Sequence, residues 1–199
     1  MSLNRFAIVI LALANAGSVI GMTLITPSLT MIKSNFEASA DKTQLILTSF
    51  IFFVAIGQLL FGTLSDKLGR RPIIIFGAFL YSMGGVLAII SPYIEFLILM
   101  RIIQGLGAAA CLSMARVIVN DSFQREEAAQ KLSFITAVMV IFPNVALISG
   151  GIIADTIGWR GSMFTLSVFG FFLFLCTLKL IPETKPLNFG KFFNSELLD

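Results

Sequence analysis

The sequence contains no histidine and only two cysteines, and these absences remove several classes of protein. Cys111 and Cys176 lie in long apolar stretches without a CxxC spacing. Zinc sites and nucleophilic dyads normally draw on closely spaced cysteine and histidine, and the chain also lacks a GxSxG segment. We therefore expect no metal, no cofactor and no enzymatic activity.

Charge is also scarce: 13% of the residues are charged, 57% are hydrophobic, and the mean hydropathy is +0.94. Soluble domains are about 45–50% apolar, and in water a chain of this length buries roughly 70% of its surface. Lipid must therefore cover much of the apolar surface. The net charge of +3 comes from basic residues between apolar runs, so it indicates a membrane face and not a nucleic-acid partner.

Six apolar stretches are long enough to cross about 30 Å of hydrocarbon. They cover residues 6–32, 44–64, 72–90, 94–119, 132–154 and 162–181. The first is too long for a signal peptide, and we interpret it as a retained span. The predicted fold class is an all-α integral membrane protein, with a six-helix transmembrane bundle over residues 1–181 and a cytoplasmic tail over residues 182–199.

The distribution of lysine and arginine predicts the orientation, because basic loops stay on the cytoplasmic side. With the N-terminus inside, ten basic residues are cytoplasmic, namely Arg5, Lys67, Arg70, Arg71, Arg116, Arg125, Lys131, Lys179, Lys185 and Lys191. Three are outside, namely Lys33, Lys42 and Arg160. We expect a multi-pass protein of the inner (plasma) membrane with both termini in the cytoplasm.

A weak internal repeat appears at an offset of 89 residues. Four residues of the first copy, Gly62, Asp66, Gly69 and Arg71, align with Gly151, Asp155, Gly158 and Arg160. Three predicted helices separate the copies, so the copies must face opposite sides of the membrane. This pattern predicts two inverted three-helix repeats, as in secondary transporters.

The strongest local motif is GTLSDKLGRRP, residues 62–72, between two predicted spans. Its glycines permit close helix approach and unusual backbone angles, and its charges can form an ionic latch at the membrane face. The residues that we assign to this latch are Gly62, Asp66, Lys67, Gly69, Arg70 and Arg71.

This motif resembles the signature loop of the major facilitator superfamily. RIIQGLG at 101–107 resembles that family's fourth-helix motif, and PET at 182–184 resembles its usual close to helix six. ARVIVND at 115–121 and IGWR at 157–160 resemble the bicyclomycin-resistance type of drug:proton antiporter. The resemblance implies the N-terminal six-helix half of a twelve-helix carrier, with the tail as the start of its central loop. It also implies that Arg70 pairs with Asp121 and that Asp66 meets a helix of the other half.

Arg101 lies within a predicted span, where a guanidinium must face a wet cavity, pair, or snorkel to the interface. Gln104 is one helical turn away, which favours a polar cavity, and the resemblance implies that Arg101 takes part in proton coupling. The other cavity candidates are Asn15, Thr23, Met139 and Asn144. Thr23 stands where the bicyclomycin type normally carries an aspartate.

Pro143, Gly150 and Gly151 resemble the helix-five motif of drug antiporters, in which proline and glycine bend the helix. Leu147 stands where those antiporters usually carry a second proline. We expect these residues to allow helix five to bend during transport.

These features favour proton-coupled efflux of drugs or small amphipathic compounds. The expected partners are a small-molecule substrate, protons and the lipid bilayer, together with a second six-helix half or a second copy in a homodimer. Two alternatives stay open: a truncated, non-transporting remnant of such a carrier, or a half that carries a metabolite in place of a drug.

Overall fold

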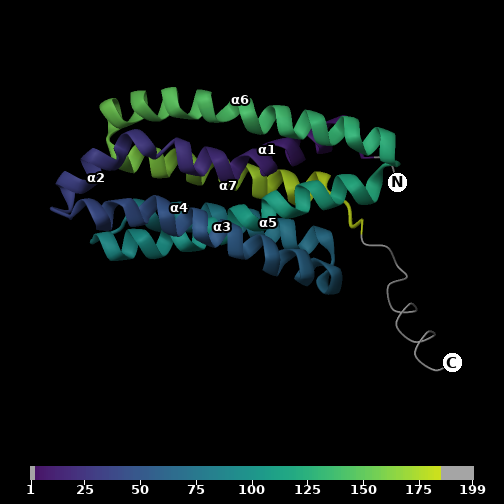
Figure 1. Cartoon of the computed structure of the whole chain (residues 1–199), viewed down its shortest axis with the longest axis horizontal. Coiled ribbons are helices and arrows are strands. Elements are labelled where there is room, and N and C mark those ends of the chain that lie inside the picture. The colour runs from purple at the N-terminus through teal and green to yellow at the C-terminus, as the bar shows by residue number, and fades with distance from the viewer. Residues whose placement is uncertain (1–2, 185–199) are drawn as a thin grey trace.

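The computed structural model describes residues 3–184, and these residues form a bundle of helices (Figure 1). In chain order they are α1 (Arg5–Thr23), the 3-10 turn η1 (Thr26–Ser28), α2 (Leu29–Asn35), α3 (Ala40–Leu68), α4 (Arg70–Ile89), α5 (Ile94–Ser122), α6 (Arg125–Ile157) and α7 (Trp159–Leu180). Six segments of the described chain are long and apolar enough to span a membrane. The first of them runs from α1 through α2, and the other five are α3 to α7. The predicted fold class is confirmed, whereas most of the predicted tail lies outside the described residues.

The first predicted span is interrupted. α1 ends at Thr23, and η1, which contains Pro27, separates it from α2. Proline has no backbone N–H and its ring clashes with the preceding helical turn, so a regular helix cannot pass through this point unchanged. The predicted span over residues 6–32 is confirmed as part of one membrane-length segment, Arg5–Asn35, within which η1 interrupts the α-helix.

Several helices extend beyond the predicted spans. α6 has 33 residues, about 50 Å at 1.5 Å per residue, which exceeds the hydrocarbon thickness of about 30 Å. Its first turn carries Glu126 and Glu127, and acidic side chains stabilise the positive end of a helix dipole. α3 begins early for a similar reason, because Ser39 accepts a hydrogen bond from the backbone N–H of Lys42 as an N-cap.

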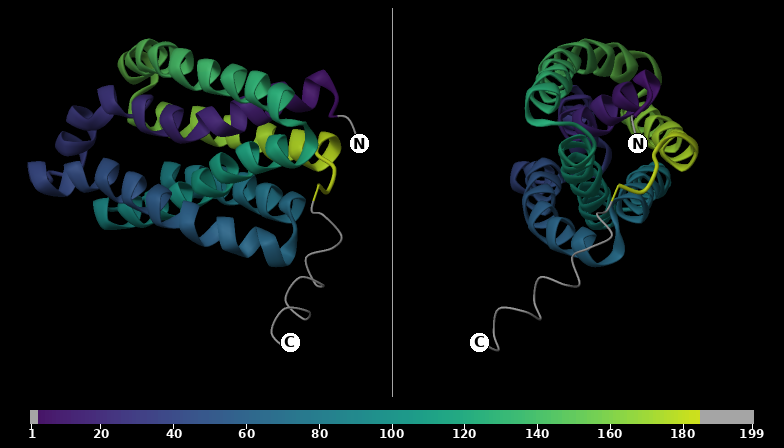
Figure 2. Two further views of the ribbon diagram at one scale, coloured as in Figure 1. Left: turned by 45° about the vertical axis from the view of Figure 1, so that its right-hand side comes forward. Right: turned by 90° about the vertical axis from the view of Figure 1, so that its right-hand side faces the viewer.

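α5 lies at the centre of the bundle because small residues let its neighbours approach closely. A Cβ atom at Gly105 would lie 2.6 Å from the backbone oxygen of Phe50 in α3. One at Gly107 would collide with the backbone of Tyr81 in α4. Such contacts between small residues are the usual packing device of membrane helices. Consequently 61% of the apolar window of α5 is buried, against 28% for α3 and 17% for α6, which flank the bundle (Figure 2).

The bundle has two ends, each marked by a helix–glycine–helix turn. Gly69 joins α3 to α4 with φ +100°, and Gly158 joins α6 to α7 with φ +85°. Positive φ is accessible to glycine at little cost and strains other residues. We call these the Gly69 end, where the described chain starts and stops in Figure 1, and the Gly158 end.

The two turns are related as the repeat predicts. Arg71, in the first turn of α4, donates a hydrogen bond to the carbonyl of Leu178 near the end of α7, at 2.9 Å. Arg160, in the first turn of α7, donates to the carbonyl of Ile89 at the end of α4, at 3.1 Å. Each arginine satisfies a carbonyl that the end of the other helix leaves without an intrahelical partner. The inverted three-helix repeats are thus confirmed.

Gly62 does not make the close helix approach that was predicted for its motif, and Gly151, its counterpart in the repeat, lies in an equally open position. A Cβ atom built on Gly62 or on Gly151 would meet no other atom of residues 3–184 within 4 Å. Within the described chain neither glycine mediates a close helix contact, because both face outward from the bundle.

Candidate functional site

An ionic cluster around Arg70 ties three helices together at the Gly69 end. Its Nε donates to Asp121 Oδ2 of α5 at 3.0 Å, and its Nη1 donates to Asp66 Oδ1 of α3 at 2.7 Å and to the Ser65 hydroxyl at 3.1 Å. Only 8% of the Arg70 side chain is exposed, so these bonds are largely protected from water. The pairing of Arg70 with Asp121 that the family resemblance implies is present.

The carboxylate of Glu183 completes this end and was missed as a site residue. It accepts hydrogen bonds from the backbone N–H groups of Arg70 at 2.8 Å and Arg71 at 3.3 Å. These groups open α4 and have no intrahelical acceptor, so an anion here also complements the helix dipole. The PET segment at 182–184 was the available signal. Lys67, the remaining charge of the motif, is exposed at the same end.

Arg101 lies in a cage of neutral acceptors inside the bundle. Its guanidinium donates to Gln104 Oε1 at 2.5 Å, to the Gly21 carbonyl of α1 at 2.7 Å and to the Ile46 carbonyl of α3 at 3.5 Å. The Phe50 ring lies 4.1 Å from the guanidinium carbon, as in a cation–π contact. The side chain therefore links α1, α3 and α5.

The expectation that Arg101 and Gln104 line an open cavity is not met. Both residues have 0% exposure, and the guanidinium does not snorkel to the interface either. Because backbone carbonyls and one amide satisfy the arginine within the helix packing, it needs neither water nor the membrane surface. Gln104 in turn donates to the Tyr81 carbonyl at 3.4 Å, and the Tyr81 hydroxyl donates to the Gly17 carbonyl at 3.0 Å.

A second polar cluster joins α1, α5 and α6. Arg116 Nε donates to Asn15 Oδ1 at 3.1 Å, and Arg116 Nη2 lies 3.7 Å from Met139 Sδ. Asn15 Nδ2 also approaches Met139 Sδ, at 3.3 Å. Asn15 and Met139 were predicted from the sequence, whereas Arg116 was counted as a cytoplasmic charge. The available signal was its position inside the predicted span 94–119.

The remaining cavity candidates do not join either cluster. The Thr23 hydroxyl donates to the Val19 carbonyl of its own helix at 2.9 Å and is half-buried. Asn144 is exposed on α6 and donates to the Val140 carbonyl at 3.2 Å. Both side chains therefore serve local helix contacts in this structure.

Pro143 lies inside a helix that continues to Ile157, and the predicted bending at this point stays a prediction. Gly150 is buried against the backbone of Leu24, where a Cβ atom would collide. Beside it, α1, α6 and α7 enclose an apolar hollow of about 170 Å³, which Phe142 and Phe169 help to line. The proline and glycine thus lie where α6 meets the interrupted first span.

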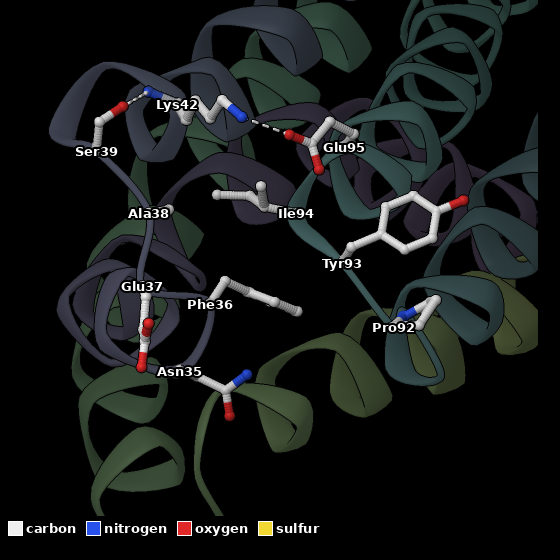
Figure 3. A pocket seen from close by; sticks show the side chains of 10 residues that line it. All are labelled: Asn35, Phe36, Glu37, Ala38, Ser39, Lys42, Pro92, Tyr93, Ile94 and Glu95. Atoms are coloured by element: carbon white, nitrogen blue, oxygen red, sulfur yellow. Dashed lines mark hydrogen bonds and ion pairs between the residues drawn. The ribbon is translucent and has the colours of Figure 1, made fainter.

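A larger hollow, of about 510 Å³, opens at the Gly158 end (Figure 3). It lies between the segments 35–42 and 92–95, and Lys42 Nζ bridges it by an ion pair to Glu95 Oε1 at 2.6 Å. Both partners are more than half exposed, so the pair is weak in energy. The hollow is a surface feature that is separate from both arginine clusters.

Two inverted three-helix repeats, with arginine clusters within the bundle and an ionic cluster at one end, define the architecture of a secondary transporter. The chain belongs to the Major Facilitator Superfamily, whose family model matches residues 11–193. This membership identifies a transporter fold and not an enzyme.

Curated relatives match this chain over less than half of their own length. An uncharacterized MFS-type transporter of Bacillus subtilis is 33% identical over 164 residues, which are 81% of this chain and 41% of the relative. A bicyclomycin resistance protein homolog of Haemophilus influenzae is 32% identical over 165 residues, 82% of this chain and 41% of the relative. The chain therefore spans about two fifths of the length of these relatives.

Among solved structures, the proton:xylose symporter XylE superposes with a TM-score of 0.79. The match covers 90% of this chain and 45% of the symporter at 15% identity, so it supports the fold alone.

Proposed function

We propose that this chain forms one six-helix half of a proton-coupled efflux carrier for small amphipathic compounds, with the Gly69 end in the cytoplasm. Family membership and the similarity to a bicyclomycin resistance protein homolog support transport of such compounds. The excess of basic residues at the Gly69 end supports the orientation, which places both chain ends in the cytoplasm of an inner-membrane protein.

The observation that carries this proposal is the Arg70 cluster. A carrier that works by rocking of helix bundles needs contacts at one membrane face that form in one state and break in the other. Arg70 is held by Asp121, while its second partner, Asp66, keeps 66% of its side chain exposed. An exposed carboxylate on a buried arginine is available to a second half, so the cluster is suited to act as a cytoplasmic latch.

A second six-helix unit completes the carrier in this proposal, either as a second copy or as another chain segment. α3 and α6 expose large apolar side chains along their length, including Phe52, Leu59, Val140 and Ile148. These faces are available for packing against the other half. α1 and α5 lie between them (Figure 2), where a solute path would run.

Proton coupling in this proposal does not use a mid-span carboxylate of the described residues. Every aspartate and glutamate within residues 3–184 lies within three residues of a helix end or in a connecting segment. The fully buried cation within the described bundle is Arg101, which stays protonated at ordinary pH. In this proposal no mid-span carboxylate of residues 3–184 carries the proton, and we assign Arg101 and Gln104 the role of a fixed positive charge beside the path.

The test uses everted vesicles from a bacterial strain that lacks its major drug efflux pumps and expresses the chain. An acidic interior is generated by respiration and followed by acridine orange quenching, and chloramphenicol, ethidium or fusidic acid is then added. We expect at least one compound to dissipate the gradient and to be less toxic to the cells. Arg70→Ala should abolish both effects, whereas the control Arg125→Ala should not.

The competing interpretation is a remnant that inserts and does not transport. It predicts no dequenching for any compound and equal susceptibility for the chain, its Arg70→Ala variant and the empty vector. A chain that is strictly monomeric in mild detergent and gives these results contradicts the proposal, because six helices alone do not enclose a solute path.

A further inference from the structure

Arg116 carries its charge into the middle of the bundle. It lies six residues before the end of α5, about 9 Å from that end at 1.5 Å per residue. Side chains on a helix tilt toward its N-terminus, so Arg116 points away from the Gly69 end and toward mid-span. Its partner Asn15 confirms this direction, because it lies ten residues into α1, about 15 Å from the Gly69 end. The guanidinium therefore lies near half the hydrocarbon thickness.

The charge of Arg116 is not neutralised. Its contacts are the Asn15 amide oxygen and the Met139 sulfur, both of which are neutral. Within residues 3–184 no carboxylate oxygen lies within 4 Å of its nitrogens. Arg101 is completely buried, and backbone carbonyls accept its hydrogen bonds, whereas Arg116 is exposed. An exposed, unpaired cation at membrane depth is costly unless it serves a ligand or an aqueous path.

The surroundings orient this cation before any ligand arrives. Asn15 has 0% exposure, so its amide cannot turn away freely, and it engages only the Nε–H of Arg116. A guanidinium has five N–H donors in a planar fork, and its terminal donors match an anionic group with two or three oxygens. Holding the fork in place lowers the entropy cost of binding. Asn15 is thus a positioning residue and Arg116 the group that would touch the ligand.

We propose that Arg116, positioned by Asn15, binds the anionic group of a small amphipathic substrate: a carboxylate, sulfonate or phosphate on an apolar body. This rests on the proposed transport function and specifies its substrate class. The apolar body would lie beside Met139 of α6, which is half-buried and already contacts Arg116. The alternative partner for Arg116 is a carboxylate side chain of the second six-helix unit. We favour the substrate because α1 and α5 lie between the flanking α3 and α6, whose exposed apolar faces would meet a second unit first (Figure 2).

The test compares two fluorescent probes that differ in one group: 1-anilinonaphthalene-8-sulfonate, which is an anion, and N-phenyl-1-naphthylamine, which lacks the sulfonate. Each is titrated into the purified full chain in dodecyl maltoside, with protein-free micelles as the baseline. The measured quantity is the ratio of the two dissociation constants. A charge-assisted hydrogen bond contributes about 1.5–3 kcal/mol, so we expect Arg116→Gln to weaken sulfonate binding about tenfold or more. Binding of the neutral probe should change less than twofold.

Three further variants separate a ligand site from a loss of structure. Arg116→Lys keeps the charge without the planar fork and should retain part of the sulfonate preference. Asn15→Ala should weaken sulfonate binding less than Arg116→Gln. Arg125→Gln removes an exposed positive charge at the start of α6 and should leave the ratio unchanged, which controls for net charge.

Two results would overturn the proposal. One is an unchanged ratio in Arg116→Gln, and the other is an equal loss for both probes in a variant that elutes like the parent chain. Either result would leave Arg116 as the counter-charge for an acidic side chain of a second unit. Because probe binding needs no gradient and no transport, failure here is distinguishable from failure of the vesicle assay.

Discussion

The two turns at opposite ends of the bundle have the same backbone conformation, but different side-chain contacts stabilise them. In each, a glycine with positive φ joins two helices, and an arginine of the first turn donates to a carbonyl at the end of an antiparallel neighbour. The shared residues of the repeat build this geometry. Its hydrogen bonds need only glycine's backbone freedom and a long donor side chain, so they survive sequence divergence elsewhere.

The residue that follows each glycine makes the difference. At the Gly69 end it is Arg70, which lies between Asp66 and Asp121. At the Gly158 end it is Trp159, which is 4% exposed and packs on Phe36 with ring centroids 5.5 Å apart. One turn is therefore stabilised by ion pairs, which can be exchanged for pairs with another partner, and the other turn is stabilised by aromatic packing. This asymmetry is what a carrier with a single cytoplasmic latch would need.

The largest expected effect is on the aromatic turn. Trp159→Ala removes a buried ring and leaves a cavity against Phe36, and such truncations cost about 3–5 kcal/mol. We expect a loss of about 3 kcal/mol in unfolding by sodium dodecyl sulfate titration from mixed micelles. Trp159→Phe, which keeps most of the packing, should lose less than half as much. Equal losses for both variants would refute the packing explanation.

The ionic turn should respond next. Arg70→Ala leaves Asp121 without its partner in a poorly hydrated position, and we expect a loss of about 2 kcal/mol in the same titration. Adding Asp121→Asn should restore part of the stability, because it removes the orphaned charge. Arg160→Ala, which removes the exposed arginine of the other turn, should cost less than about 1 kcal/mol. An Arg160→Ala loss as large as that of Arg70→Ala would remove the distinction between the two ends.

Alanine at the two glycines compares the turns directly. Gly158→Ala should cost about 1 kcal/mol, since its φ is strained for other residues and the added Cβ meets nothing within 4 Å among the described residues. Gly69→Ala should cost about 2 kcal/mol, because its Cβ would lie 2.5 Å from the Glu183 carboxylate. In a Glu183→Ala background the two glycine substitutions should cause equal losses of thermal stability. A persistent difference would mean that Glu183 is not its cause.

The smallest effect is expected for the ion pair at the Gly158 end. Lys42 and Glu95 are 55% and 56% exposed, so water and salt screen their attraction. Glu95→Gln should leave both the thermal transition and its salt dependence unchanged. In contrast, Arg70→Ala should lower the thermal transition at both low and high salt, because the Arg70 cluster is largely protected from water. A salt response that depends on Glu95 would show that an ion pair also stabilises the Gly158 end.

The helical spans could be predicted because they depend on local properties. A run of about 20 apolar residues must cross the bilayer as a helix, whatever surrounds it, since lipid offers its backbone no hydrogen-bond partner. The repeat was also readable, since Gly69 and Gly158 occupy positions where positive φ is required. The helix break at Pro27 was missed because the apolar sequence continues through this point, although proline has no backbone N–H to donate to the helix.

The environment of each arginine could not be predicted in the same way. Arg101 and Arg116 lie on one helix within apolar sequence, yet one is enclosed by the carbonyls of Gly21 and Ile46 and the other is exposed beside Asn15. Those partners come from helices between 55 and 101 residues away along the chain. Hydrophobic length, positive charge and the repeat at an offset of 89 residues therefore specified six spans, a basic end and the inversion from the residues alone. Only the packed bundle decided which charge is satisfied inside and which is exposed beside Asn15, because burial depends on neighbours that no local pattern encodes.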